Sequence, residues 1–279
     1  MKSLFRIRTV TAFLTLHPKD FSDNGDIPST LETKISATAT LLQRLQNDLT
    51  GAGYEVQTLR MATNPFGEWI LPTIRLTASD DDEEEDNVRI SKEDVVVAQS
   101  RLEQLSAQLK QHGITLCAVG PATSVSEIKQ CCPLIVSDTS GILSCSANVG
   151  ATQVSMATAA AEAVHIISKL ESGLGNFRFC VTAANTKPFI PFFPAAKSAS
   201  SLLDTTAEGP PNENNSNKNN NGLVGFALGL ENGKLAQHLL QKCKSMENIS
   251  TIFRNGMVQA LTPVQGMCIL VCIYTAVFY

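Results

Sequence analysis

Hydrophobic positions follow two different spacings along most of the chain. Runs rich in β-branched and aromatic residues predict strands, and apolar residues three and four positions apart predict helices. Strands are predicted at 4–16, 54–62, 114–119, 134–137, 176–184 and 223–230, with a further candidate at 142–149, and helices at 30–50, 91–112, 151–171 and 233–246. Because parallel strands need a crossover that a helix usually supplies, this alternation indicates an α/β fold with a mainly parallel sheet.

Turn and capping residues set the ends of these elements. Gly120-Pro121 predicts a turn after the third strand, and Pro133 is expected to end a short helix. Three pairs have the spacing of a capping box, in which two residues satisfy each other's backbone N–H groups. They are Ser29 with Glu32, Ser91 with Asp94, and Ser124 with Glu127.

Two insertions and a tail interrupt the pattern. The loop 78–88 contains seven consecutive acidic residues, and 198–221 contains seven asparagines within 212–221, so neither buries enough apolar area to order itself. The organisation predicted is a domain at 1–255 containing both insertions, followed by an aberrant apolar tail at 256–279. The uncharged run 267–279 is shorter than the roughly 20 residues that span a bilayer, so we do not expect membrane insertion.

Charge and cysteine usage narrow the classes of function. The net charge is −4, and without the seven clustered acids the remainder carries +3, which provides no broad basic surface for nucleic acid. The eight cysteines lie mostly in apolar runs and match no zinc pattern. Arginines at 6 and 8 disrupt the apolar start, which argues against a signal peptide, so we expect reduced thiols in the cytoplasm.

Three arginines, Arg8, Arg60 and Arg178, fall within or at the ends of predicted strands. Strands covered on both faces are normally apolar, so such an arginine needs a carboxylate, a ligand anion or solvent. One interpretation is an anion-binding pocket at the carboxyl ends of the strands. The other is a structural ion pair, with Glu231 as a candidate partner.

Neutral hydrogen-bonding side chains could complete such a pocket. Thr9, Thr11, Asn176 and Asn185 are the candidates, although β propensity alone explains the threonines. No catalytic residue, cofactor or metal site is indicated. Cys145 and Cys180 fit inert core thiols, because no paired histidine is evident.

Several short stretches resemble one family when taken together. They are RIRTVT from Arg6, GYEVQTLR from Gly53, ATNPF from Ala62, GNFRF from Gly175, PFFPA from Pro191 and FALGLE from Phe226. In this order they are similar to the front part of the domain-of-unknown-function family 711, also called uncharacterised protein family 0210. The resemblance implies a partial α/β barrel of the pyruvate formate-lyase-like type, without implying radical chemistry.

Three hypotheses of function follow from these observations. The first is an enzyme-like barrel that binds a small anionic metabolite at the carboxyl ends of its strands. The second is a non-catalytic regulatory or interaction protein on the same scaffold. One candidate partner is a second copy of the chain, which would form a homo-oligomer. The third is a truncated, inactive family member with an exposed sheet edge.

Overall fold

The computed structural model describes residues 4–22, 26–71, 90–138, 140–183, 187, 189–199, 222–243, 248–267 and 273–275. Its strands are β1 (Arg6–Leu14), β2 (Val56–Thr63), β3 (Cys117–Ala122), β4 (Leu143–Val149), β5 (Phe179–Ala183), β6 (Leu223–Glu231) and β7 (Ile273–Thr275). Its α-helices are α1 (Ser29–Gly51), α2 (Lys92–Gln111), α3 (Cys132–Val136), α4 (Val154–Ile167), α5 (Gly233–Leu240) and α6 (Ile249–Met267). Short helical turns are η2 (Pro18–Asp20), η3 (Phe66–Glu68), η5 (Glu127–Cys131) and η6 (Leu170–Arg178).

The described strands form one sheet in the order β5-β4-β3-β2-β1-β6-β7. The pairs β2–β3, β3–β4, β4–β5 and β6–β7 are parallel. β6 runs antiparallel to β1, because Gly222 bonds Thr15 near one end while Glu231 pairs with Arg8 near the other. The predicted α/β class with a mainly parallel sheet is therefore confirmed, whereas closure into a pyruvate formate-lyase-like barrel stays a prediction.

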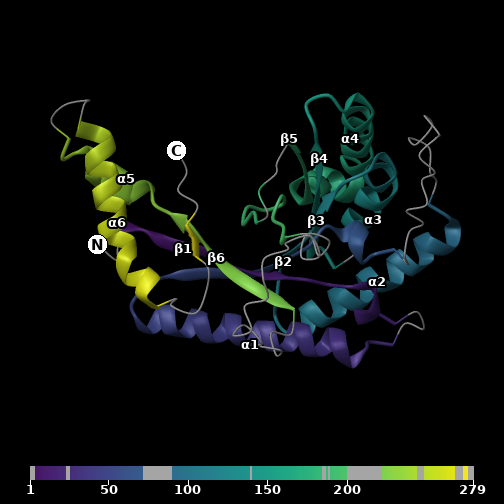
Figure 1. Cartoon of the computed structure of the whole chain (residues 1–279), viewed down its shortest axis with the longest axis horizontal. Helices are drawn as coiled ribbons and strands as arrows, with labels where there is room; N and C mark the ends of the chain where they lie inside the picture. Colours follow the sequence, from purple (N-terminus) through teal and green to yellow (C-terminus); the bar gives the residue numbers. More distant parts are fainter. Residues whose placement is uncertain are drawn as a thin grey trace, which may run out of the picture. The chain divides into compact units, whose positions relative to one another are not determined.

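The chain divides into two compact units. The first comprises Met1–Ala12, Thr40–Arg60 and Gly225–Tyr279, and the second comprises Phe13–Ala39 and Met61–Val224. In the first unit, α5 packs against α6, drawn in yellow-green and yellow in Figure 1. In the second unit, α3 and α4 pack against the β4 and β5 part of the sheet, drawn in teal and green.

Most of the predicted elements occur close to their expected positions. The candidate strand at 142–149 is β4, while the predicted strand at 134–137 is wrong, since these residues belong to α3 and the following turn. Pro133 does not end a helix as predicted, because it occupies the first turn of α3, where its missing N–H costs no hydrogen bond. The predicted segment 78–88 and residues 200–221 lie outside the described residues.

Gly120 and Pro121 do not end the third strand in a turn. They lie inside β3, where the register with β4 shifts between Ala118 and Pro121. Gly120 has φ +82°, and a Cβ there would lie 2.7 Å from the backbone oxygen of Asn64. This irregularity therefore lets β3 approach the chain that leaves β2, which requires glycine for both conformation and space.

Replacing Gly120 by alanine should lower the free energy of unfolding by about 3 kcal/mol, because strain at positive φ adds to a backbone clash. Gly113→Ala is the matched control, since Gly113 has φ +71° but no atom within 4 Å of the added Cβ. The free energy of unfolding of this control variant should fall by only about 1 kcal/mol. Urea unfolding measures the stability of both variants. Equal losses of stability would contradict the close approach of Gly120 to the Asn64 backbone.

Candidate functional site

Arg8 and Arg60 lie on the neighbouring strands β1 and β2 in the first unit. Thr58 joins the two strands by donating from Oγ1 to the Arg8 carbonyl at 2.8 Å. Burial lowers the pKa of the half-buried Arg60, and the positive charge of Arg8 lowers that pKa further. Two of the three candidate arginines are thus within electrostatic range of each other.

The ion pair of Arg8 is exposed. Its Nη1 lies 3.5 Å from Glu231 Oε2, and the two side chains are 63% and 48% exposed. A pair of this kind contributes only about 0–1 kcal/mol, because water screens both charges. The carboxylate of Glu231 is therefore only weakly held by Arg8.

Thr9 and Thr11 lie on β1, the strand that carries Arg8, but their side chains are buried in the core. They are 7% and 0% exposed, and their Oγ1 atoms are 3.4 Å apart. A Cβ at Gly229 would lie 2.5 Å from Thr9 Cγ2, so the backbone of β6 covers this face. The two hydroxyls therefore bond each other in the core.

Arg178 lies in the second unit, where it is the last residue of η6 and directly precedes β5. The predicted strand at 176–184 thus begins later than expected, and Asn176 and Arg178 lie at the amino end of β5. The cause is a kink in η6, in which Glu171, Ser172 and Gly173 have positive φ angles. Asn176 is exposed, and Asn185 lies outside the described residues.

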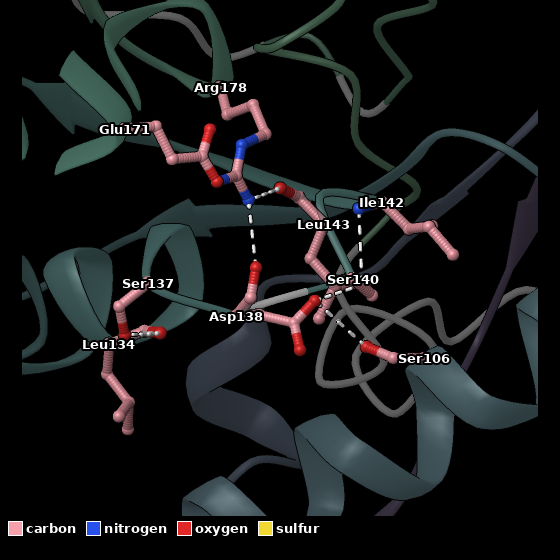
Figure 2. Close-up of polar contacts among 9 residues, drawn as sticks. All are labelled: Ser106, Leu134, Ser137, Asp138, Ser140, Ile142, Leu143, Glu171 and Arg178. Carbon is pink, nitrogen blue, oxygen red and sulfur yellow. Dashed lines mark hydrogen bonds and ion pairs between the residues drawn. The ribbon is translucent and has the colours of Figure 1, made fainter. Parts of the chain in front are cut away.

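The residue Arg178 is buried, and Figure 2 shows the acceptors around its guanidinium. Nη2 lies 2.5 Å from Glu171 Oε1, and Nη1 donates to the carbonyls of Leu143 at 3.4 Å and Asp138 at 3.5 Å. The Asp138 carboxylate in turn accepts from Ser106 and Ser140. Arg178 therefore ties η6 to the loop between α3 and β4, with Glu171 rather than Glu231 as its carboxylate partner.

A second polar cluster lies at the carboxyl ends of β1 and β2, centred on Asn64. Asn64 is fully buried, accepts from the Leu16 N–H at 2.8 Å and donates to the Leu16 carbonyl at 3.1 Å. Its amide also donates to Glu68 Oε2 at 2.7 Å, while its backbone oxygen accepts from Trp69 Nε1 at 3.3 Å. Asn64 thereby joins the two strand ends and orients Glu68.

Charged groups follow β1 directly at the same end. Lys34 Nζ lies 2.5 Å from Asp20 Oδ2 and donates to the Thr15 carbonyl at 3.2 Å. The same Asp20 oxygen accepts from the His17 N–H at 2.9 Å. Burial and the charge of Lys34 lower the pKa of His17, so its imidazole is neutral at pH 7.

Glu127 adds a buried carboxyl after β3. It is 8% exposed, and its Oε2 accepts from the Thr123 N–H at 2.6 Å and the Thr123 hydroxyl at 3.1 Å. Its own N–H donates to Ser124 Oγ at 3.2 Å, so the predicted Ser124–Glu127 spacing does form a cap. Burial raises the pKa of Glu127 against the effect of these hydrogen bonds, and the nearby charge of Glu68 raises it slightly.

The loop before the asparagine-rich segment reaches this cluster too. The Ser198 N–H donates to the Thr63 carbonyl at 2.8 Å, at the end of β2. The Ser198 hydroxyl is buried without a hydrogen-bond partner in the part of the chain that the structure describes. Burial also lowers the pKa of the adjacent Lys197.

Most of the described cysteines are core thiols. The six are free, and Cys117, Cys131, Cys132 and Cys145 are buried. Burial raises the pKa of Cys117 to about 12 and that of Cys180 to about 11, which removes the thiolate at neutral pH. Within the described ranges, no group of three or more His, Cys, Asp or Glu side chains is arranged to hold a metal ion.

The sequence contains partial signals for the polar residues that follow β1, β2 and β3. Asn64 stands in the ATNPF stretch that resembles the family, and Glu127 stands in a predicted capping box. Neither pattern reveals that the two side chains come from adjacent strand ends, because only the sheet order brings them together. A search for polar residues directly after each predicted strand would have found Asn64 and Glu127.

Alternating helices and strands around a mostly parallel sheet define an α/β protein. The family described as Uncharacterised ACR (DUF711) matches residues 1–276, essentially the whole chain. The chain belongs to this family, and the match includes most of the tail that the sequence pattern separated from the barrel domain. No curated protein matches it. None of the described helices has the length and hydropathy needed to cross a membrane.

Arg178→Gln should lower the free energy of unfolding by about 2–4 kcal/mol, because two backbone carbonyls lose a charged donor in a buried setting. Arg8→Gln should cost less than about 1 kcal/mol, since its ion pair is exposed. Urea denaturation measures both variants. A loss for Arg178→Gln no larger than that for Arg8→Gln would contradict the structural role.

Proposed function

We propose that this chain binds a small anionic metabolite through Arg8 and Arg60. The observation that carries the proposal is the placement of two guanidinium groups on adjacent strands, close enough that one lowers the pKa of the other. The positive charges of the half-buried Arg60 and the exposed Arg8 repel each other, and a bound anion would relieve that repulsion. Guanidinium groups also bind carboxylate and phosphate with two parallel hydrogen bonds.

The exposed contact with Glu231 supports exchange at this place. An incoming carboxylate or phosphate competes with Glu231 for Arg8, and the exposed pair contributes little stability that the ligand must overcome. Arg178 is outside this proposed pocket, because its donors serve Glu171 and two carbonyls. We place the function in the cytoplasm, a location supported by the free thiols of the described cysteines.

The test is thermal unfolding with phosphate, citrate or malonate at constant ionic strength. A ligand that binds only the folded chain raises the melting temperature. Arg60→Gln should weaken the apparent affinity by about 10-fold or more, because a charged hydrogen bond contributes about 1.5–3 kcal/mol. Arg8→Gln should weaken it as well.

Two controls separate this site from general charge effects. Arg44→Gln removes an exposed arginine from α1 in the same unit and should leave the anion response unchanged. Arg178→Gln should lower the melting temperature while preserving the response to anions. Equal anion responses in the natural chain and in Arg60→Gln would overturn the proposal, as would the absence of any saturable response.

A further inference from the structure

The sheet of the described strands has β5 at one edge and β7 at the other. β7 has only three residues, whereas β5 has five, and all five pair with β4 in one continuous parallel register. None of the described strands pairs with the other side of β5. An edge strand of this kind presents a row of backbone N–H and C=O groups with which a further strand can pair.

β5 lacks the features by which edge strands usually avoid pairing with another chain. These features are a charged side chain, a proline or a bulge in the strand. The sequence of β5, FCVTA, contains neither charge nor proline, and its register with β4 shows no shift. Val181 in the middle of the strand is 46% exposed. Nothing within β5 itself therefore opposes the addition of a strand.

Exposed apolar side chains gather around this edge. Thirteen large apolar residues are exposed in the described part of the chain, and six of them lie between residues 154 and 181. This stretch comprises α4, η6 and β5, and α4 packs against β5 (Figure 1). The six are Val154, Val164, Ile166, Leu174, Phe177 and Val181. A concentration of exposed apolar side chains in one part of a protein marks an interaction surface.

The two most prominent side chains at the amino end of β5 are held in place by close packing. Leu174 is 59% exposed, and Phe177 is 80% exposed. Gly175 lies between them in the sequence, and a Cβ there would lie 2.8 Å from the carbonyl oxygen of Ile167. The backbone that carries Leu174 and Phe177 is thus fixed against the end of α4.

A strained turn precedes these two residues. Glu171 and Ser172 have φ angles of 48° and 56°, a region that residues other than glycine rarely adopt. The buried Arg178 closes the turn through its ion pair with Glu171. Strain of this kind persists only where the surrounding contacts enforce it, and it is frequent at functional sites. The fold therefore stabilises a conformation that leaves apolar side chains in solvent.

The sequence of β5 is complementary to itself when two copies run antiparallel. With Val181 on a twofold axis, Phe179 of each copy lies opposite Ala183 of the other, and Cys180 lies opposite Thr182. A large side chain then meets a small one, and no charge meets a like charge. A symmetric dimer needs such a surface, because the same residues serve on both sides of the axis.

We propose that a second copy of this chain binds along β5 and forms a twofold dimer whose sheet continues across the axis. Leu174 and Phe177 lie beside the paired strands and lose solvent exposure in the dimer. A second copy fits better than an acidic or basic peptide, because β5 has no charged side chain with which such a peptide could pair. The dimer goes beyond the anion site of the first unit and does not depend on it.

Sedimentation velocity of the full chain over a series of concentrations tests the proposal. The natural chain should show a reversible equilibrium between monomer and dimer. Val181→Lys should raise the dissociation constant of the dimer by about 10-fold or more, because two like charges meet at the axis. Val224→Lys is the matched control, since Val224 is 45% exposed on β6, which has a strand on each side. This control should leave the dissociation constant unchanged.

A second variant tests the register of the paired strands. Val181→Cys places two thiols opposite each other at the axis. Diamide takes up one hydrogen from each thiol, and the two sulfurs join as a disulfide, so a covalent dimer should appear on a non-reducing gel. Val224→Cys is the matched control for the additional thiol and should give much less of this product.

Four outcomes would each overturn the proposal. They are a natural chain that stays monomeric into the millimolar range, equal weakening by Val181→Lys and Val224→Lys, equal cross-linking of Val181→Cys and Val224→Cys, and open-ended assembly without a dimer. Val181→Lys should keep the melting-temperature response to anions, because Arg8 and Arg60 lie in the first unit. The dimer and the anion site can therefore fail separately.

Discussion

The hydrogen bonds of one buried amide, Asn64, hold together the strand ends of the second unit. A buried amide group must satisfy its donors and its acceptor within the protein, since water cannot reach it. Asn64 does so with the Leu16 backbone and with Glu68, while its backbone oxygen accepts from Trp69. These hydrogen bonds fix the ends of β1 and β2 and the direction of η3. The polar groups at this edge of the sheet are therefore held in fixed positions relative to one another. The bulge at Gly120 extends the frame to β3.

The arginines show how burial decides the role of a charged side chain. Arg178 is 7% exposed, and its guanidinium is surrounded by a carboxylate and two carbonyls, so its charge is used inside the protein. Arg8 is largely exposed and holds Glu231 only at 3.5 Å. The donors of Arg178 hold a loop in place, whereas the ion pair of Arg8 is weak because water screens it. Arginines in similar sequence contexts therefore differ in burial and in how firmly their partners hold them.

The sequence predicted the long elements and missed what depends on neighbours in space. Helices α1 and α2 were predictable because the apolar spacing repeats along each of them, and in α2 the Ser91 cap agrees with it. The short run 134–137 was misassigned, because periodicity cannot separate a four-residue strand from one helical turn. Gly120-Pro121 resembles a turn in sequence, and only its contact with Asn64 explains why the strand continues. The late start of β5 depends on positive φ angles at Glu171 and Ser172, which no propensity scale favours.

Glu127 illustrates the same limit after β3. A capping box accepts glutamate or glutamine, because one side-chain oxygen suffices for the cap. In this fold Thr123 donates both its N–H and its hydroxyl to Glu127 Oε2, and the Glu127 N–H donates to Ser124 Oγ. These hydrogen bonds to the carboxyl favour its charged form, whereas burial favours the neutral form and has the largest effect on the pKa of Glu127. The spacing of Ser124 and Glu127 therefore predicts the cap, while the depth at which the fold buries the carboxyl decides how its charge is stabilised.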